Sequence, residues 1–444
     1  MEQSEYDTFI QNAMHVQPVI NIGVIGHVAN GKSTITGAIT GIKTQKHANE
    51  KERGITIRLG YANAKIFKCE SCKAPECYQS TGSAIITHKC TQCGKSAILV
   101  SHVSFTDVPG HHLLMSTMLN GTCVMDYTIL VESSANEIIP APQTIEHYHT
   151  TKKVGIDTQL ICLNKVDLLV KNKYKYPEIL NNIRHFIKQN QNTEIPIIPV
   201  SGSLNCNIDV LCEYISKMKI PKKNLTPDFK MLIIRSFNVN NPNTNIKDLK
   251  GGVVGGSLVR GIINVGQDVV MYPGHITKKS GTIWTYKPLT SKVVSINTDK
   301  SKLNSAIPGG LIGVQLTVDP ALTGSDVLVG QIVFRKEKDI ESIKIYEGIK
   351  IEYSKMNDDD SIKKATTVQV NVNSNNVNGK VVKSSKVLDE NAVTKLYHLY
   401  LELEKPICVE LNDVVTINKL SDEGSINIFG HGKIVDGISS EKMA

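Results

Sequence analysis

The segment Gly26-His27-Val28-Ala29-Asn30-Gly31-Lys32-Ser33 constrains the fold most, because it fits the pattern G-x-x-x-x-G-K-[ST]. An apolar run, Val19–Ile25, precedes it, and a stretch that favours a helix follows it. Strand, loop and helix therefore stand in the order that a phosphate-binding loop requires. Backbone N–H groups at the helix N-terminus can surround a phosphate, Lys32 adds a positive charge, and the Ser33 hydroxyl can bind Mg²⁺.

Short apolar runs alternate with helical stretches from residue 19 to residue 200, as in a mostly parallel sheet with crossover helices. A helix is expected from Pro177 towards Gln191. The expected strands are Val19–Ile25, His102–Thr106, Tyr127–Glu132, Gln159–Leu163 and Ile195–Val200.

Beyond residue 220 the pattern changes to short β-branched runs broken by Gly, Pro, Asn and Asp, which predicts two β-barrel domains. Five asparagines between Asn371 and Asn378 suggest an exposed hairpin or loop. We expect an N-terminal extension over 1–18, an α/β nucleotide-binding domain over 19–220, a first barrel over 221–338 and a second over 339–444.

Composition excludes several classes of protein. Of 444 residues, 41% are apolar and 21% are charged, which is typical of a packed chain and not of a disordered one. No apolar run approaches the length of a membrane span, and the first 20 residues contain three acidic residues and no Lys or Arg. We therefore expect a cytoplasmic protein with neither a membrane anchor nor a presequence.

The positive charge is concentrated in one part of the chain. Residues 221–335 carry +8, against +3 for residues 1–220 and −3 for residues 336–444. A local excess of this kind suits a polyanionic partner such as RNA, but solvated lysines on a barrel surface would give the same count. Charge alone does not decide between these readings.

A second motif, Asp107-Val108-Pro109-Gly110, follows the predicted strand that contains Phe105. The Asp107 carboxylate can reach Mg²⁺ directly or through water, and the Gly110 N–H can donate to a γ-phosphate. Turns of this composition are common, so the motif is informative only beside the phosphate loop.

A third motif, Asn164-Lys165-Val166-Asp167, ends the strand expected over Gln159–Leu163. A carboxylate there can accept hydrogen bonds from N1–H and N2–H of guanine, a pair of donors that adenine does not offer. Ser201-Gly202, after the last predicted strand, lies where a backbone N–H could support the guanine oxygen. The three motifs together predict binding of GTP or GDP with Mg²⁺.

Cys69-x-x-Cys72 and Cys90-x-x-Cys93 are separated by 17 residues, which is the spacing of a four-thiolate zinc knuckle. The surrounding insertion, residues 66–97, has few bulky apolar residues, so a structural zinc ion would supply folding free energy that a core cannot. The alternative is a flexible loop with reduced cysteines. Cys77 is either a spare thiol or an alternative ligand.

The order of these segments resembles the translational GTPases and, among them, the gamma subunits of eukaryotic and archaeal translation initiation factor 2. The resemblance covers residues 20–335. It rests on the phosphate loop, the cysteine hairpin, the Asn164–Asp167 motif and the segments 53–65, 107–121, 248–253 and 306–314.

The resemblance implies roles for individual residues. Thr56 would coordinate Mg²⁺ and close over the γ-phosphate, and His111 would position the attacking water beside Gly110. Tyr61 would contact the acceptor end of a tRNA. Nucleotide contacts are implied for Asn30, Gly31, Lys32, Ser33, Thr34, Asn164, Lys165, Asp167, Ser201 and Gly202. Asn30 and Gly202 stand where relatives usually have histidine and alanine, and we expect both to contribute mainly through their backbone.

The implied function is GTP-dependent delivery of methionylated initiator tRNA to the small ribosomal subunit, with hydrolysis of GTP, slow without an activating partner, switching off tRNA affinity. The implied partners are an alpha subunit on the second domain, a beta subunit on the first, an activating protein and a nucleotide-exchange factor. Two alternatives remain open from the residues: an elongation-type or selenocysteyl-tRNA delivery factor, and a nucleotide-binding scaffold of a heteromeric complex.

Overall fold

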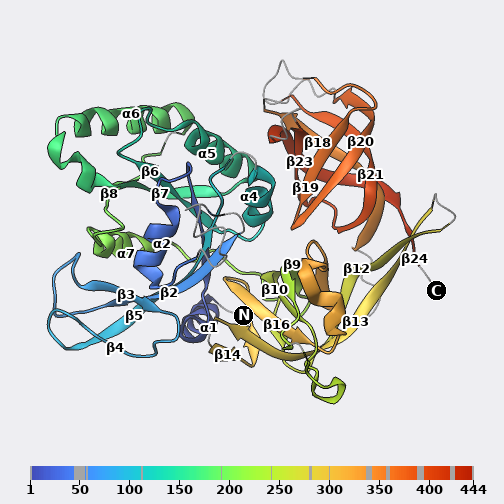
Figure 1. Cartoon of the computed structure of the whole chain (residues 1–444), viewed down its shortest axis with the longest axis horizontal. Coiled ribbons are helices and arrows are strands. Elements are labelled where there is room, and N and C mark those ends of the chain that lie inside the picture. The colour runs from blue at the N-terminus through green and yellow to red at the C-terminus, as the bar shows by residue number, and fades with distance from the viewer. Residues whose placement is uncertain are drawn as a thin grey trace. The chain divides into compact units, whose positions relative to one another are not determined.

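The structure is a computed structural model that describes residues 3–44, 56, 59–111, 114–191, 193–241, 243–279, 283–299, 301–336, 343–356, 361–387, 395–420 and 426–442. The chain forms two compact units (Figure 1). The first contains residues 1–223 with 298–301 and 309–311, and the second contains the remainder.

The first unit is built on an eight-stranded sheet in the order β3-β2-β5-β1-β6-β7-β8, with β4 paired to β5. The strands β1, β5, β6, β7 and β8 run parallel, whereas β2, β3 and β4 pair antiparallel. Their bounds are β1 Ile20–Ile25, β2 Gly60–Lys68, β3 Tyr78–Gly82, β4 His88–Lys89, β5 Ser96–Asp107, β6 Tyr127–Ser133, β7 Asp157–Asn164 and β8 Ile197–Pro199. The predicted mostly parallel α/β domain is confirmed.

Helices pack on this sheet because each buries one apolar stripe. Helix α5 contacts β1, β6 and β7, helix α2 contacts β1, β2, β3 and β5, and helix α7 contacts β3 and β5. The helices are α1 Gln3–Val16, α2 Lys32–Thr40, α4 Met115–Thr122, α5 Pro142–Val154, α6 Lys175–Asn190 and α7 Ile208–Ser216, with a 3₁₀ turn η2 at Val166–Lys171. Helix α6 begins two residues before Pro177, and Phe186 joins its buried face.

Residues 1–18 include a packed helix. Ile10 and Met14 of α1 are buried, and the Met14 carbonyl oxygen lies 2.9 Å from Nδ1 of His102 in β5. The Tyr6 hydroxyl accepts a hydrogen bond from the Lys223 backbone N–H at 2.6 Å. This helix therefore belongs to the first unit and contacts the end of that unit's chain.

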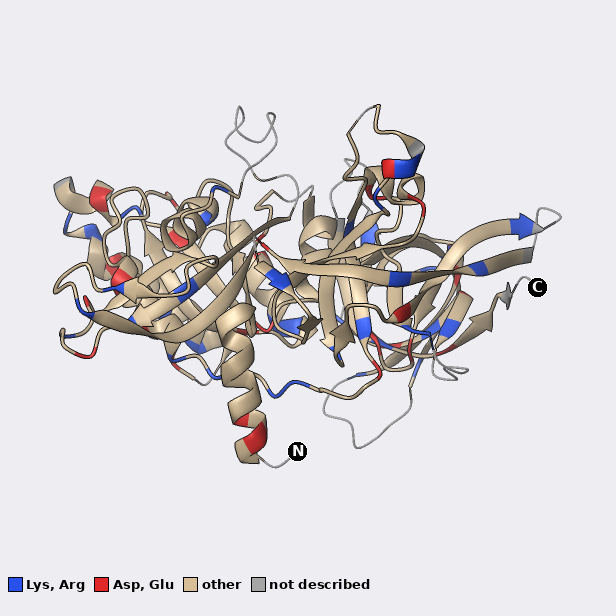
Figure 2. Ribbon diagram, turned by 90° about the horizontal axis from the view of Figure 1, so that it is seen from below, with Lys and Arg blue, Asp and Glu red and all other residues tan. Residues whose placement is uncertain are grey.

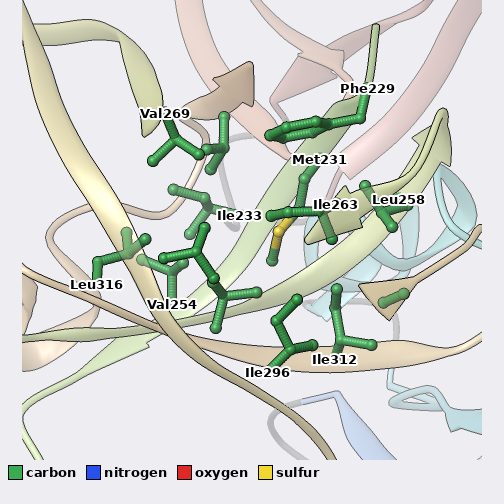
Figure 3. Close-up of a cluster of buried hydrophobic side chains, with 14 of the residues drawn as sticks. Phe229, Met231, Ile233, Val254, Leu258, Ile263, Val269, Ile296, Ile312 and Leu316 are labelled. Carbon is green, nitrogen blue, oxygen red and sulfur yellow. The ribbon is translucent and has the colours of Figure 1, made fainter. Parts of the chain in front are cut away.

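The second unit begins with a ring of six strands, β12-β17-β9-β10-β16-β13, which the pairing of β12 with β13 closes. Phe229, Met231, Ile233, Val254 and Ile296 point towards one another inside it (Figure 3). The elements are β9 Lys230–Phe237, η3 Ile246–Asp248, β10 Val253–Arg260, β11 Ile263–Asn264, β12 Asp268–Lys279, β13 Ile283–Thr298, β14 Ser301–Leu303, β15 Ser305–Ala306, β16 Leu311–Leu316, η4 Pro320–Asp326 and β17 Ile332–Arg335.

A second closed barrel follows in the order β18-β21-β20-β19-β22-β23, around its own apolar core. The two barrels predicted from the sequence are therefore present. The strands are β18 Lys344–Lys355, β19 Thr367–Val372, β20 Asn375–Lys386, β21 Tyr397–Val409, β22 Val414–Leu420 and β23 Ile426–Ser439, and β24 Glu441–Lys442 pairs with β13.

The asparagine-rich segment forms the β19–β20 hairpin, but it is not simply exposed. Asn371 and Asn375 are buried, and the Asn375 side-chain amide bonds to the Gly330 carbonyl of the first barrel. The predicted hairpin is confirmed, but the expected exposure is wrong because these amides find partners inside the second unit. Burial of a polar group costs little when its hydrogen bonds are made.

A group of ion pairs around the buried Lys230 joins the two barrels. Lys230 Nζ lies 3.0 Å from Glu410 and 2.9 Å from Asp413, and Arg260 makes two 2.7 Å hydrogen bonds to the Glu410 carboxylate. Burial alone would raise the pKa of Glu410, but Arg260 and Lys230 lower it to about 2. The two cations therefore hold this carboxylate in its charged form.

No helix among the described residues is long and apolar enough to cross a membrane.

We predict that Glu410→Gln lowers the free energy of unfolding of the second unit by about 3 kcal/mol, because it leaves Lys230 buried with a weakened partner. The control is Glu352→Gln, whose ion pairs with His398 and Lys433 are 3.8 Å long and more exposed. That change should cost under about 0.5 kcal/mol. Hydrogen exchange of the barrel strands measures both.

The pH dependence follows from the direction of the pKa shift. A carboxyl whose pKa is lowered on folding stabilises the fold above its unfolded pKa, near 4.5, and loses that contribution as the pH falls towards about 2. The difference between wild type and Glu410→Gln should therefore shrink over that window. A difference that stayed constant down to pH 2 would contradict the ion-pair account.

Candidate functional site

The loop between β1 and α2 borders a cavity of about 340 Å³. Gly31 adopts a φ of +95°, and a Cβ at this position would collide with the Asn164 side chain, so only glycine fits. The cavity is lined by Val28, Ala29, Gly31, Lys32, Ser33, Thr34, Thr56, Gly110, His111, Asn164, Lys165 and Ser203. Nine of these residues were predicted as nucleotide or catalytic residues, and they come from four separate parts of the chain.

Lys32 opens helix α2 and is only 6% exposed. Its ammonium donates to the carbonyl oxygens of Gly26 at 2.9 Å and His27 at 2.8 Å. Burial lowers the pKa of Lys32 to about 8, although Asp107 and Glu132 oppose the shift. The site therefore holds a cation whose charge is costly without further anionic partners, and a phosphate would supply them.

Asn164, at the end of β7, forms hydrogen bonds with two loops, the phosphate loop at Asn30 and the loop at Gly202. Its side-chain N–H donates to the Asn30 carbonyl at 2.8 Å, and its Oδ1 accepts from the Gly202 N–H at 3.1 Å. The Asn30 amide also donates to the Val131 carbonyl at 2.8 Å. The expectation that Asn30 acts mainly through its backbone is thus incomplete, because its side chain anchors the loop to β6.

Helix α5 supports the phosphate loop from behind, which the sequence analysis missed. The Gly26 N–H donates to Nδ1 of His147 at 3.2 Å, and the His27 N–H donates to Oγ1 of Thr144 at 3.1 Å. Burial lowers the pKa of His147 to about 3, so the ring stays neutral and can accept. Thr144 and His147 are three residues apart on one helix face, which is a signal a sequence reading could have used.

Glu132, at the end of β6, is a second residue that the sequence analysis did not single out. It is 1% exposed, and its carboxylate accepts hydrogen bonds from the N–H groups of Ser133 and Ala141, both at 3.2 Å, and from the Asn136 side chain. Burial raises its pKa, whereas these hydrogen bonds oppose the shift. Glu132 therefore ties the end of β6 to the start of α5.

Four polar side chains converge at the end of β5. Ser33 and Thr44 each donate a 2.6 Å hydrogen bond to Oδ2 of Asp107, and the Thr56 hydroxyl oxygen lies 3.0 Å from that of Ser33. Asp107 is fully buried. The three residues predicted to bind Mg²⁺ are therefore together, and Thr44, which belongs to no motif, joins them. Hydroxyl and carboxylate oxygens are ligands that Mg²⁺ prefers, so these residues fit that ion.

The predicted catalytic residues Gly110 and His111 line the same cavity as Lys32 and Thr56. Tyr61 lies on β2, opposite Thr106 of β5, and is not among the residues that line it. Of the segment 53–65, on which the resemblance partly rests, residues 53–55, 57 and 58 lie outside the described residues.

Asp167 lies in η2, directly after β7. Its Oδ1 is a buried acceptor with no hydrogen-bond partner among the described residues. Such an atom is costly unless a ligand donates to it, as guanine N–H groups would. The Ser201 N–H donates to the Cys206 carbonyl, and the Gly202 N–H donates to Asn164 Oδ1. Neither Ser201 nor Gly202 is among the residues that line the cavity, whereas their neighbour Ser203 is.

The sulfur atoms of Cys69, Cys72, Cys90 and Cys93 all lie within 4.8 Å of one another. The Cys69–Cys93 and Cys72–Cys90 sulfur distances are 3.5 and 3.7 Å. A tetrahedral zinc ion with Zn–S bonds of about 2.3 Å requires sulfur separations of about 3.8 Å, so the four thiols fit zinc. The Cys77 thiol is outside this group, and burial raises its pKa.

Gln79 of β3 supports the cysteine group and was also missed. Its amide N–H donates to Cys90 Sγ at 3.5 Å and to Thr91 Oγ1 at 2.8 Å, and its Oε1 accepts from the Thr91 N–H at 3.0 Å. Hydrogen bonds of this kind orient metal ligands.

The fold and the site define a GTP-binding domain of the translation-factor type. Residues 17–221 match the family model described as elongation factor Tu GTP binding domain. Among solved structures, a bacterial selenocysteine-specific elongation factor aligns at a TM-score of 0.67 and 21% identity, over 94% of this chain and 58% of that one. The factor SelB of Methanococcus maripaludis, solved with the GTP analogue GppNHp, aligns at 0.67 and 20%, over 95% of this chain and 79% of that one. At these identities the likeness shows the fold alone.

Sequence comparison is more specific. The chain is 39% identical to the gamma subunit of eukaryotic translation initiation factor 2 from Encephalitozoon cuniculi, covering 96% of this chain and 95% of that protein. It is 38% identical to the Schizosaccharomyces pombe gamma subunit, covering 95% and 94%, and 45% identical to subunit 3 of the same factor from Drosophila melanogaster, covering 71% and 67%. The chain belongs to the gamma-subunit family of translation initiation factor 2 and is a GTPase of translation initiation.

We predict that GDP affinity falls above pH 8. The free protein releases the Lys32 proton near pH 8, whereas a bound phosphate favours the charged form, so binding takes up a proton at higher pH. The affinity should fall by up to about tenfold per pH unit. Isothermal titration between pH 7 and pH 10 measures the slope.

Lys32→Arg is the matched control, because its guanidinium stays charged throughout this range. Its affinity should change less with pH than that of wild type, whatever its absolute value. Parallel pH profiles for the two proteins would contradict the assignment to Lys32.

Proposed function

We propose that this chain carries methionylated initiator tRNA to the small ribosomal subunit in its GTP-bound form and loses tRNA affinity when GTP is hydrolysed. The observation that carries the proposal is the 38–45% identity to gamma subunits of translation initiation factor 2, together with a built nucleotide cavity. The selenocysteine-specific neighbours share only the fold at 20–21% identity, so they do not favour the delivery-factor alternative.

In this proposal, different residues of the site contact the phosphates and the base. The N–H groups of the loop up to Thr34, with Lys32, hold the phosphates, as the buried ammonium requires. The Asp167 carboxylate accepts the guanine N–H groups. Lys165, Asn164 and the 201–203 loop border the base.

Ser33, Thr56 and Asp107 would hold Mg²⁺, which neutralises phosphate charge when bound. Ser33 can do so while keeping its hydrogen bond to Asp107, because a hydroxyl has one proton to donate and lone pairs left for a metal. His111, beside Gly110, would orient the attacking water through a ring nitrogen.

The nucleotide can act as a switch because Thr56 and Gly110, from separate segments, border one cavity. A γ-phosphate bonded to both would hold both segments, and its loss would release them. We propose that this ordering builds the surface that receives the tRNA acceptor end, with Tyr61 as a contact residue.

Residues 221–335, at +8, are proposed to contact phosphates of the tRNA. Figure 2 shows Lys and Arg in blue, including positions along the long β12–β13 hairpin. Lys278 and Lys287 of this hairpin are exposed, and Lys278 lies 4.7 Å from the Trp284 ring centre. A paired cation and aromatic ring can contact both a phosphate and a base.

The subunit names of the relatives support a multi-subunit assembly. We propose an alpha subunit on the first barrel, a beta subunit on the GTP-binding domain, and transient contacts with an activating protein and an exchange factor. We also propose a structural zinc ion at Cys69, Cys72, Cys90 and Cys93.

We predict that the protein loaded with a nonhydrolysable GTP analogue retains methionylated initiator tRNA at least about tenfold more tightly than the GDP form, within the usual range of coupling between two sites. Filter binding with methionylated, deacylated and elongator tRNA measures this. Equal affinity in both nucleotide states would refute the switch, and a preference for elongator tRNA would favour a delivery factor.

The same assay tests Tyr61. Removing a stacking ring by Tyr61→Ala should weaken tRNA binding by about 1 kcal/mol or more without changing GDP affinity. Tyr174→Ala is the control, because this tyrosine is 75% exposed and does not line the nucleotide cavity.

For the zinc site, we predict about one zinc ion per purified chain and its loss in Cys93→Ser, because a structural zinc ion needs four ligands. Cys206→Ser is the control: Cys206 is likewise exposed but lies outside the cysteine group. Native mass spectrometry measures the metal. Equal zinc content in both variants would refute the assignment.

A further inference from the structure

Thr44 is the one member of the Asp107 group that no motif contains and that the proposed function does not use. Helix α2 ends at Thr40, and Gly41 follows in a left-handed conformation with a φ of 71°. Thr44, three residues later, is 4% exposed and donates to Oδ2 of Asp107 at 2.6 Å. A hydroxyl hydrogen bond to a buried carboxylate is one of the stronger kinds in proteins.

The space that Thr44 occupies is provided by a neighbouring strand. Gly60 begins β2 directly opposite Asp107 in the antiparallel pair β2–β5. A Cβ at Gly60 would lie 2.8 Å from the Thr44 Cβ and 3.4 Å from the Asp107 Cβ. Real Cβ atoms do not approach this closely, so a side chain at position 60 would displace Thr44. The absence of a side chain at Gly60 therefore allows the Thr44 hydroxyl to reach the carboxylate.

Asp107 Oδ2 accepts hydrogen bonds from two hydroxyl groups, those of Ser33 and Thr44, which have different roles. Ser33 can bind a metal and donate at the same time, and it lines the cavity beside Lys32 and Thr56. Thr44 donates to the same carboxylate oxygen but is not among the residues that line this cavity. Thr44 is thus placed to orient the carboxylate from outside the cavity. Outer hydrogen bonds of this type typically change metal affinity by about 10-fold to 100-fold when removed.

We propose that Thr44 is a positioning residue for the magnesium site, and that Gly60 is glycine because it must admit the Thr44 side chain. This inference rests on the proposed role of Asp107 and Ser33 in binding Mg²⁺.

The test measures the release rate of a fluorescent GDP analogue as Mg²⁺ is added. The quantity compared between variants is the midpoint, the Mg²⁺ concentration that gives half of the full decrease in that rate. Thr44→Val, nearly the same shape without the hydroxyl, should raise that concentration about tenfold, equivalent to about 1.4 kcal/mol. Release in excess EDTA should stay within about twofold of wild type, because only the metal-dependent part is affected. Thr44→Ser should restore the wild-type midpoint.

Thr36→Val is the matched control. Thr36 is a buried threonine of the same helix, and its hydroxyl donates to the Lys32 carbonyl at 3.0 Å and not to Asp107. Its Mg²⁺ midpoint should equal that of wild type. Gly60→Ala provides a second route to the same effect and should raise the midpoint without removing any hydroxyl.

The outcomes separate the two claims. If wild-type release does not depend on Mg²⁺, the proposed magnesium site is wrong and this inference falls with it. If wild type depends on Mg²⁺ but Thr44→Val and Gly60→Ala keep its midpoint, only the inference about Thr44 is overturned. A Thr44→Ser variant that behaves like Thr44→Val would also overturn it.

Discussion

The buried carboxylate of Asp107 is the group on which the site depends. A buried charge is stable only when it is paired and hydrogen-bonded. Here the hydroxyls of Ser33 and Thr44 donate hydrogen bonds to the carboxylate. Lys32 interacts with it electrostatically, which opposes the fall in the pKa of Lys32. Because Ser33 lies in the first turn of a helix, Thr44 follows that helix and Asp107 ends a strand, one carboxylate connects three segments. The phosphate loop, the β5 end and the connection after α2 therefore form a single electrostatic unit.

The loop itself is held by hydrogen bonds from helix α5 and from Asn164. Its first two N–H groups are satisfied by His147 and Thr144, and the Asn30 carbonyl is satisfied by Asn164. Each of these bonds gives a buried backbone group a hydrogen-bond partner within the protein. The remaining N–H groups of the loop are then available to a phosphate. Pre-organisation of this kind lowers the cost of ordering the loop when nucleotide binds.

In the second unit, ion pairs and hydrogen bonds of polar side chains connect one barrel to the other. Lys230, Arg260 and Glu410 form ion pairs there, and Asn375 bonds to the Gly330 carbonyl. Such contacts contribute to specificity of docking because a shifted arrangement would leave charges unpaired.

The sequence by itself determined the α/β class, the two barrels, the phosphate loop, the guanine motif and the cysteine group, because strand and helix periodicity and contiguous motifs are local properties. It did not indicate five single polar residues that belong to no motif: Thr44, Glu132, Thr144, His147 and Gln79. It also predicted an exposed asparagine hairpin, whereas Asn371 and Asn375 of that hairpin are buried. Only the tertiary structure decided those, because burial and hydrogen bonding depend on which distant strands and helices come to lie beside a residue.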